Sequence, residues 1–193
     1  MEDVKAMQAK WDNRYQATVS NNCEPAQVLS DYGHLLPAQG DALDLACGLG
    51  GNTLFLAKAG LRTKAWDISP VAIGRLEQMV RQQGLTVEAL VRDVVARPPE
   101  PDSFDVIVVS YFLERDLMPA ICAALRPGGL LFYQTFTRDK VTDRGPKNPD
   151  YLLAENELLR LCQGMRIRVY REEGCLGDVA TGLRNEALLV AQV

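Results

Sequence analysis

Short apolar runs alternate along the chain with longer segments whose apolar positions follow helical spacing. Seven of these runs have the length and composition of β-strands; they cover residues 42–46, 62–66, 86–91, 104–109, 130–136, 165–171 and 183–191. Strands that alternate with helical segments predict βαβ units around a parallel sheet. The last two runs have no helix between them. We therefore expect a seven-stranded, mostly parallel sheet with an antiparallel last strand and helices on both faces.

Helices are predicted between the runs, over residues 53–59, 70–83, 116–125 and 155–162. Ser69 followed by Pro70 is the sequence pattern of a helix N-terminus. Two further helices, 3–16 and 25–36, precede the first strand and could lie over the carboxyl ends of the strands as a cap. Residues 126–129 are expected to form a turn. The polar, proline-containing segment 137–150 is expected to form a loop or lid.

Composition limits the class of protein. The 193 residues are 47% apolar and 24% charged, which is typical of one soluble globular domain. We divide it into a helical cap over 1–38 and an α/β core over 41–193. The net charge of −4 argues against nucleic acid as a partner, and the absence of a signal peptide or membrane-length apolar run favours the cytoplasm. The five cysteines are odd in number and never spaced C-x-x-C, which predicts reduced thiols and no metal site.

Four features fall at the predicted carboxyl ends of strands, where open α/β sheets bind their ligands. They are the glycine turn 47–51, Asp67, Asp93 and the pair Ser110-Tyr111. Glycines let a backbone approach a ligand closely. The Asp67 carboxylate could accept ribose hydroxyls, and Asp93 could accept the exocyclic amine of adenine. These features together predict an adenosine-binding rim.

Apolar side chains beside the two aspartates support this prediction. Ile68 and Val94 could sandwich the adenine base. A dinucleotide is less favoured, because Thr53 stands where the dinucleotide fingerprint has its third glycine. A nicotinamide-dependent oxidoreductase would also need a substrate domain, and the 193 residues leave no room for one.

The chain resembles the class I S-adenosylmethionine (SAM)-dependent methyltransferases over nearly its whole length. The resemblance lies in Leu43-Asp-Leu-Ala-Cys-Gly-Leu-Gly-Gly-Asn52, Trp66-Asp-Ile-Ser69, Arg92-Asp-Val94, Phe104-Asp-Val-Ile107 and Leu125-Arg-Pro-Gly-Gly-Leu130. It implies a Rossmann-like class I methyltransferase fold, SAM as cofactor and S-adenosylhomocysteine (SAH) as product. Ala46 departs from the pattern, since many members have glycine there.

A weaker resemblance points to the tellurite-resistance (TehB-like) and thiopurine-methyltransferase-like subgroup. It lies in Trp11-Asp-Asn-Arg-Tyr15, in residues 148–158 and in the strand 167–172. Members often carry a His-Arg pair near the last hairpin. This chain has no histidine after His34, which argues against tellurite or selenium chemistry.

The resemblance also implies site residues. The cofactor would contact Arg14, Asp44, Ala46, Gly48, Gly50, Asn52, Asp67, Ile68, Asp93, Val94 and Ser110. Arg14 would pair with the SAM carboxylate and the Ala46 carbonyl would face its amino group, while Asp44 would organise the methionine end. Asp67 would hold the ribose, Asp93 and Val94 the adenine, and Ser110 the methionine through its backbone.

The expected reaction is methyl transfer to a small-molecule acceptor, such as a thiol, a chalcogen oxyanion or another small nucleophile. Tyr111 and Arg184 are the candidate catalytic residues, since the sequence offers no histidine-based pair near the rim. Two alternatives stay open: a SAM-binding module without turnover, and a macromolecular acceptor bound by a basic surface at Arg138, Lys140, Arg144 and Lys147. The sequence does not specify the acceptor or the oligomeric state.

Overall fold

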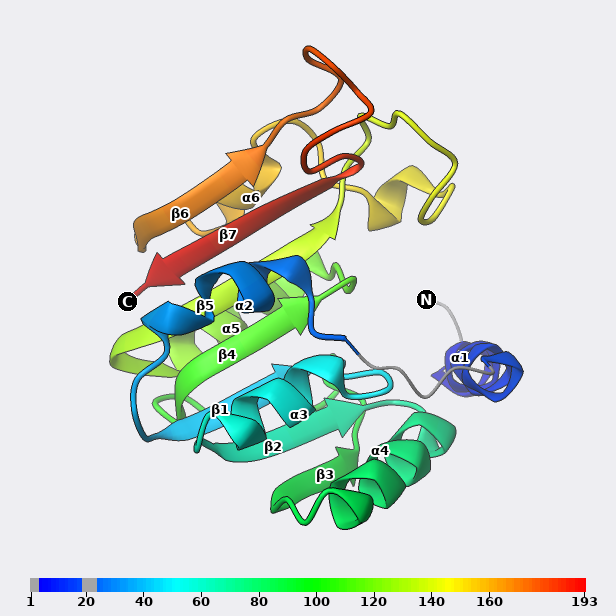
Figure 1. The fold of residues 1–193 in the computed structure, drawn as a ribbon, viewed down its shortest axis with the longest axis vertical. Coiled ribbons are helices and arrows are strands. Elements are labelled where there is room, and N and C mark those ends of the chain that lie inside the picture. The colour runs from blue at the N-terminus through cyan, green and yellow to red at the C-terminus, as the bar shows by residue number, and fades with distance from the viewer. Residues whose placement is uncertain (1–3, 19–23) are drawn as a thin grey trace.

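A computed structural model describes residues 4–18 and 24–193, in which seven strands form one sheet (Figure 1). The strands are β1 Asp41–Leu45, β2 Arg62–Asp67, β3 Val87–Val91, β4 Phe104–Ser110, β5 Leu125–Phe136, β6 Arg166–Glu172 and β7 Glu186–Gln192. Their order is β3-β2-β1-β4-β5-β7-β6. Strand β7 runs antiparallel to both neighbours, and the other pairs are parallel. The predicted sheet is confirmed.

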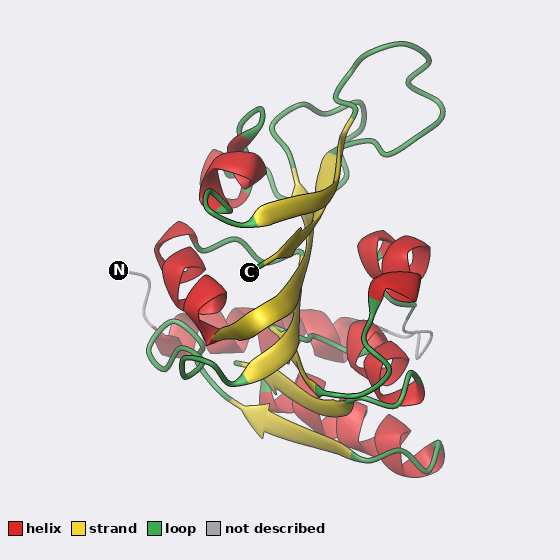
Figure 2. Ribbon diagram, turned by 90° about the vertical axis from the view of Figure 1, so that its left-hand side faces the viewer, coloured by secondary structure: helices red, strands yellow, loops and turns green. Residues whose placement is uncertain are grey.

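Helices cover both faces of the sheet (Figure 2). They are α1 Val4–Ala17, α2 Gln27–Tyr32, α3 Gly51–Lys58, α4 Pro70–Gln82, α5 Met118–Ala124 and α6 Glu157–Leu161, with short 3-10 turns η1 Gly33–Leu35, η2 Arg115–Leu117 and η3 Pro149–Tyr151. Helices α2 and α3 pack on one face, where Leu29 and Leu56 join a cluster with Val108. Helices α5 and α6 pack on the other, where Ile121 and Leu158 meet Ile107.

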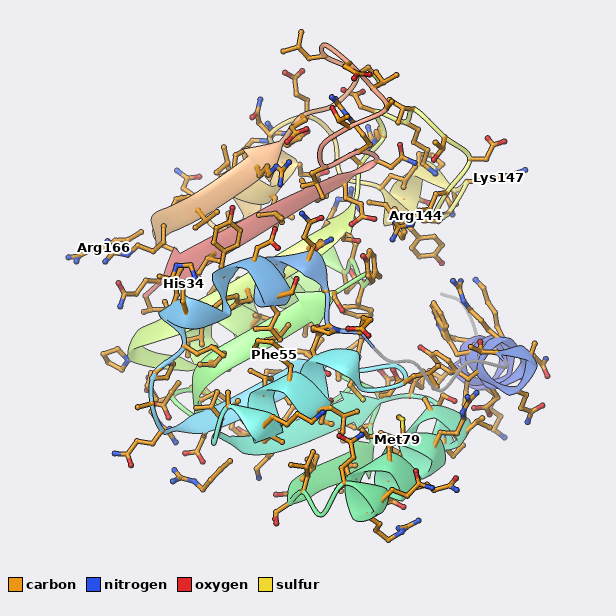
Figure 3. All side chains as sticks on the ribbon, in the orientation of Figure 1. His34, Phe55, Met79, Arg144, Lys147 and Arg166 are labelled. Atoms are coloured by element: carbon orange, nitrogen blue, oxygen red, sulfur yellow. The ribbon has the colours of Figure 1, made fainter. Side chains whose placement is uncertain are left out.

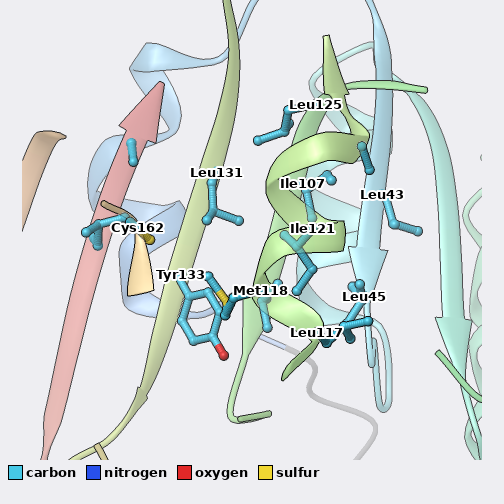
Figure 4. Packing of buried hydrophobic residues seen from close by; sticks show 14 of the residues in the cluster. Leu43, Leu45, Ile107, Leu117, Met118, Ile121, Leu125, Leu131, Tyr133 and Cys162 are labelled. Carbon is cyan, nitrogen blue, oxygen red and sulfur yellow. The ribbon is translucent and has the colours of Figure 1, made fainter. Parts of the chain in front are cut away.

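The strand pattern explains these two layers. Side chains alternate along a strand, so Ile107 and Val108 face opposite helices and β4 is buried on both sides. Figure 4 shows the α5 side of this core, with Ile121 and Met118 against Tyr133. The Tyr133 hydroxyl is satisfied by donating to the Phe112 carbonyl at 2.7 Å. The packed core holds the carboxyl ends of the strands in fixed positions.

The two N-terminal helices lie in different places. Helix α1 lies beyond the carboxyl ends of the central strands (Figure 1), in the position expected of a cap. Helix α2 instead packs on a face of the sheet, because its buried Val28 and Leu29 contact β5 and β7. The segment 25–36 is therefore part of the α/β layers rather than of the cap. The first residue of the predicted helix 3–16 and Cys23 lie outside the described residues.

The predicted turn 126–129 was wrong, because these residues form the beginning of β5. The backbone here makes strand-like hydrogen bonds: Gly128 N donates to the Val193 carbonyl and Val193 N donates to the Gly129 carbonyl, each at 3.1 Å. Gly128 has a φ of +84°, and the register with β4 shifts between Phe104 and Val106. Proline and glycine therefore mark an irregular strand entry.

Candidate functional site

The turn between β1 and α3 contains three residues with left-handed backbones. The φ angles are +57° at Ala46, +53° at Gly48 and +84° at Gly50. A Cβ atom on Gly50 would lie 2.3 Å from Leu76 Cδ1, so glycine is needed there for space as well as conformation. Ala46 adopts this conformation at a cost of roughly 1 kcal/mol. Such strain is typical of a turn that is shaped for a ligand.

Asp44 lies beneath this turn and is completely buried. Its carboxylate accepts hydrogen bonds from Thr53 Oγ1 at 2.6 Å and from Asn52 Nδ2 at 3.4 Å. Burial raises the pKa of Asp44 to about 7, although both hydrogen bonds oppose the shift. Asp44 therefore orients the first turn of α3 from inside.

Asn52 joins three parts of the chain. Its Nδ2 donates to Ser110 Oγ at 2.8 Å, and its Oδ1 accepts from Ala26 N at 2.8 Å. The glycine turn, the end of β4 and the beginning of α2 are thus fixed to one another through one buried amide. The structure brings together three predicted site residues: Asp44, Asn52 and Ser110.

Asp67 ends β2 and points toward the same turn. Its carboxylate accepts from Gly48 N at 2.8 Å and from Ser69 N at 2.9 Å, and the residue is 5% exposed. Burial raises the pKa of Asp67, and the two backbone amides oppose the shift. A carboxylate has about four lone-pair positions, so two amides leave it able to accept ribose hydroxyls. Half-buried Ile68 follows it in the chain.

Helix α1 covers the turn from outside. The Tyr15 hydroxyl lies 3.0 Å from the position that a Cβ on Gly48 would take. Ser69 Oγ donates a hydrogen bond to Asp12, and Arg75 Nη1 of α4 donates to the Tyr15 and Thr18 carbonyls at 2.7 and 2.8 Å. Helix α1 is thereby held to α4 at both its middle and its end.

Arg14, also on α1, is exposed, and its guanidinium lies 5.2 Å from the centre of the Trp11 ring. Asp93, which we predicted to contact adenine, follows β3, and its Oδ1 accepts from Val95 N and Ala96 N at 3.0 and 3.2 Å, which fixes the turn there. Val94 is 5% exposed and packs in the core. The Val94 side chain therefore packs mainly against other apolar side chains of the core.

A second polar cluster follows β4. The Tyr111 hydroxyl donates to Glu186 Oε2 at 3.2 Å, and Gln134 Nε2 donates to the same oxygen at 2.5 Å. Arg144 Nη1 lies 2.9 Å from Glu186 Oε1. Glu186 is only 2% exposed, whereas the Arg144 side chain is 61% exposed. A buried carboxylate therefore lies beside Tyr111, with its counterion supplied from the surface.

Aromatic rings border this cluster. The rings of Tyr111 and Phe136 lie 5.1 Å apart, and the Arg144 guanidinium lies 6.0 and 5.7 Å from their centres. Figure 3 places Arg144 and Lys147 on the segment 137–150, at the carboxyl-end side of the sheet. Burial, followed by the Glu186 charge, raises the pKa of Tyr111 to about 12, so its hydroxyl stays protonated near neutral pH.

Arg184 has a different environment from Tyr111. Its Nε, Nη1 and Nη2 donate to the carbonyls of Thr181, Gly174 and Asp178 at 2.6, 2.9 and 2.8 Å. The guanidinium thus holds together the loop between β6 and β7. The structure does not bring Arg184 into the contacts of the Tyr111 cluster.

Three polar residues of the site were missed from the sequence: Thr53, Gln134 and Glu186. The latter two lie within segments predicted as apolar strands, and a polar residue inside such a run was the available signal. Within residues 4–18 and 24–193, no group of His, Cys, Asp and Glu is arranged to hold a metal ion. No helix in the described ranges is long and apolar enough to cross a membrane.

The fold defines an α/β protein of the Rossmann-like type, and comparisons with known proteins give the family of its domain. Residues 42–129 match the profile of a family described as "Methyltransferase domain". The chain is 31% identical over 138 residues to a ubiquinone biosynthesis O-methyltransferase of Burkholderia vietnamiensis, which covers 67% of this chain and 58% of that relative. The chain therefore spans less than two thirds of the curated relatives it matches.

Solved structures share the fold. TehB from Haemophilus influenzae superposes with a TM-score of 0.69 at 20% identity, covering 96% of this chain and 66% of TehB. A SAM-dependent methyltransferase from Aquifex aeolicus superposes with a TM-score of 0.65 at 17% identity, covering 100% of both chains. Residues 42–129 therefore form a methyltransferase domain, and SAM is the cofactor that this family and its fold imply.

Proposed function

We propose that this protein transfers a methyl group from SAM to a small-molecule acceptor. The observation that carries the proposal is the buried Asp67 carboxylate, which is held beside the left-handed glycine turn by the Gly48 amide. A carboxylate with free lone pairs next to an open backbone suits the ribose of an adenosine ligand. When bound, SAM supplies a methyl group that its sulfonium charge has already activated.

The chain's own residues then have limited tasks. Asp67 would hold the ribose, and Asp44 would fix Asn52 and the first turn of α3. Ser110 would present its backbone to the methionine end, and Tyr15 would help to exclude water from above. Alignment and exclusion of water are major sources of rate in a displacement with an activated donor.

The acceptor is proposed as a small molecule with a nucleophilic oxygen. Support comes from the Burkholderia relative, whose name describes an O-methyltransferase. It also comes from the cluster at Tyr111 and Glu186, which is the type of proton-accepting group that a hydroxyl nucleophile needs.

Calorimetry with SAH tests the cofactor site. We expect SAH to bind, NAD not to bind, and Asp67→Asn to weaken SAH by about 10–100-fold, since hydrogen bonds to charged groups contribute roughly 1.5–3 kcal/mol. Glu88→Gln, an exposed acid on the neighbouring strand β3, is the matched control. Tight NAD binding in place of SAH would contradict the proposal.

A turnover screen separates the alternatives. SAH release with small hydroxyl and thiol acceptors would support the proposal. SAH binding without turnover of any small molecule would favour a binding module. Methylation of a protein or nucleic acid alone would favour a macromolecular acceptor at the basic segment 138–147.

A further inference from the structure

We propose that Tyr111 and Glu186 form a proton relay that deprotonates a hydroxyl acceptor. This inference rests on the proposed methyl transfer and names the groups that would serve it. Tyr111 would be the catalytic residue, because its hydroxyl would touch the acceptor. Glu186 would act through Tyr111 as the final proton acceptor.

The geometry supplies the direction of the relay. Tyr111 Oη already donates its proton to Glu186 Oε2 at 3.2 Å. Gln134 Nε2 also donates to Glu186 Oε2, and Val28 N donates to Gln134 Oε1 at 2.7 Å, so the amide cannot rotate without losing a buried hydrogen bond. The carboxylate is therefore held with its Oε2 facing Tyr111.

Access to the relay comes from the surface side. Tyr111 is 40% exposed as a residue, whereas Glu186, its hydrogen-bond partner, is buried. The two other contacts to Tyr111 Oη, from Gln134 Nε2 and Arg144 Nη2, are both long at 3.4 Å. Arg144 is mostly exposed, so an acceptor hydroxyl can replace its contact without uncovering the core.

The proximity to the cofactor rim follows from the chain itself. Ser110, which precedes Tyr111, accepts from Asn52 Nδ2 at the beginning of α3. A left-handed backbone at Tyr111, with a φ of +56°, turns the chain directly after β4. A non-glycine residue held in this conformation is typical of functional sites.

The proton transfers balance as follows. The acceptor O–H bond breaks and its proton passes to Tyr111 Oη, while the Tyr111 proton passes to Glu186 Oε2. The acceptor oxygen keeps the electron pair that forms its new bond to the methyl carbon, while the bond from that carbon to the SAM sulfur would break and leave its electron pair on the sulfur of SAH. Tyr111 ends neutral, as it began, and Glu186 ends as a carboxylic acid. Two charged or titratable groups contact Glu186: the charged Arg144, from the segment 137–150, and the titratable Tyr111.

The test compares phenol with benzenethiol, which carry O–H and S–H on the same ring. Benzenethiol is already largely ionised near neutral pH and needs no base. SAH release is followed across pH for the wild type, Tyr111→Phe and Glu186→Gln. We expect each substitution to slow phenol methylation by about 100-fold or more and to remove the acidic limb of the pH profile. The benzenethiol rate should change by less than about threefold, well below that loss.

The protein contains its own control pair. Tyr170 donates a hydrogen bond to Glu172 on edge strand β6. Tyr170→Phe and Glu172→Gln should leave both rates and the pH profile unchanged. SAH affinity should be the same in all four variants, which shows that the fold and cofactor site are intact.

The other outcomes each overturn the relay. Equal losses with both probes, a pH profile that survives in Glu186→Gln, or lost SAH affinity would assign Tyr111 and Glu186 a structural role. Methylation of benzenethiol but not phenol by the wild type would overturn the relay and the oxygen acceptor, and it would leave the proposed methyl transfer from SAM to a small molecule standing. If the wild type methylates neither probe and no other acceptor, both the relay and the proposed function are overturned.

Discussion

Asn52 and Ser110 are 58 residues apart in sequence, yet their side chains share a hydrogen bond of 2.8 Å. The bond connects the end of β4 to the first turn of α3. Because β1 and β4 are neighbours in the sheet, their carboxyl ends meet at this point. The site is therefore assembled from the ends of adjacent parallel strands rather than from one motif.

Asn52→Ala removes this connection. The substitution leaves the Ala26 amide without its buried partner, and Ser110 loses its donor. We expect the free energy of unfolding to fall by about 1–3 kcal/mol, which is typical of an unsatisfied buried group. Urea denaturation measures it. Asn148→Ala, at an exposed turn where Asn148 accepts from Asp150 N, should cost less; an equal loss would contradict the joining role of Asn52.

Asp44 should make stability depend on pH. Its folded pKa of about 7 lies above the ordinary value of 3.8, so between these pH values the folded state keeps a proton that the unfolded state has lost. Raising the pH through this window therefore lowers the free energy of unfolding. Asp44→Asn does not titrate, so its stability relative to the wild type should rise from about pH 4 to about pH 7. Urea denaturation of both proteins measures this difference. A difference in the free energy of unfolding that is the same at all pH values would refute the prediction.

Arg75 should hold α1 over the cofactor site. Its guanidinium donates to the carbonyl of Tyr15, in the last turn of α1, and to that of Thr18, which follows the helix; a positive charge at this helix end is also stabilising. We expect Arg75→Ala to speed amide hydrogen exchange in α1. We also expect it to weaken SAH binding by about tenfold, which corresponds to the net free energy of roughly one hydrogen bond. Arg81→Ala, on the same helix but in an exposed pair with Glu77, should leave both unchanged. Unaltered exchange in Arg75→Ala would show that other contacts dock α1.

Arg144 should fix the segment 137–150 through Glu186. Arg144→Ala leaves a buried charge without its counterion, so we expect a loss of about 1 kcal/mol and faster hydrogen exchange across the segment. Adding Glu186→Gln should restore part of the stability, because the unpaired charge is then gone. Lys147→Ala, at an exposed site in the same segment, should stay within about 0.5 kcal/mol of the wild type. Strictly additive losses in the double variant would contradict the coupling.

The sequence was sufficient to predict the sheet and to place the glycine turn and Asp67 at the same edge of it. The apolar run around Ile107 is long enough to predict a strand buried on both faces, and Ser69 caps α4 as its position before Pro70 predicts, with Oγ accepting from Ala72 N at 3.2 Å. These features depend on local patterns. Periodicity could not place α2, since Val28 and Leu29 would fit either a cap or a layer.

The second polar cluster could not be predicted because its members are distant in sequence. Tyr111 and Glu186 are 75 residues apart, and only the antiparallel pairing of β7 with β5 brings Glu186 beside Gln134 and Tyr111. The register of that pair decides which strand residues meet at the rim. Arg184, two residues earlier, falls in the loop and bonds its carbonyls instead.

The backbone amides of Ala26 and Val28 fix the distance between the two polar clusters of the site. One donates to Asn52 at the cofactor rim and the other to Gln134 beside Tyr111, at 2.8 and 2.7 Å. Three consecutive residues of rigid backbone thus span the two clusters. Under the proposed function, this backbone would set the spacing between methyl donor and acceptor, so changes in the segment 137–150 would alter what enters the site without changing that spacing.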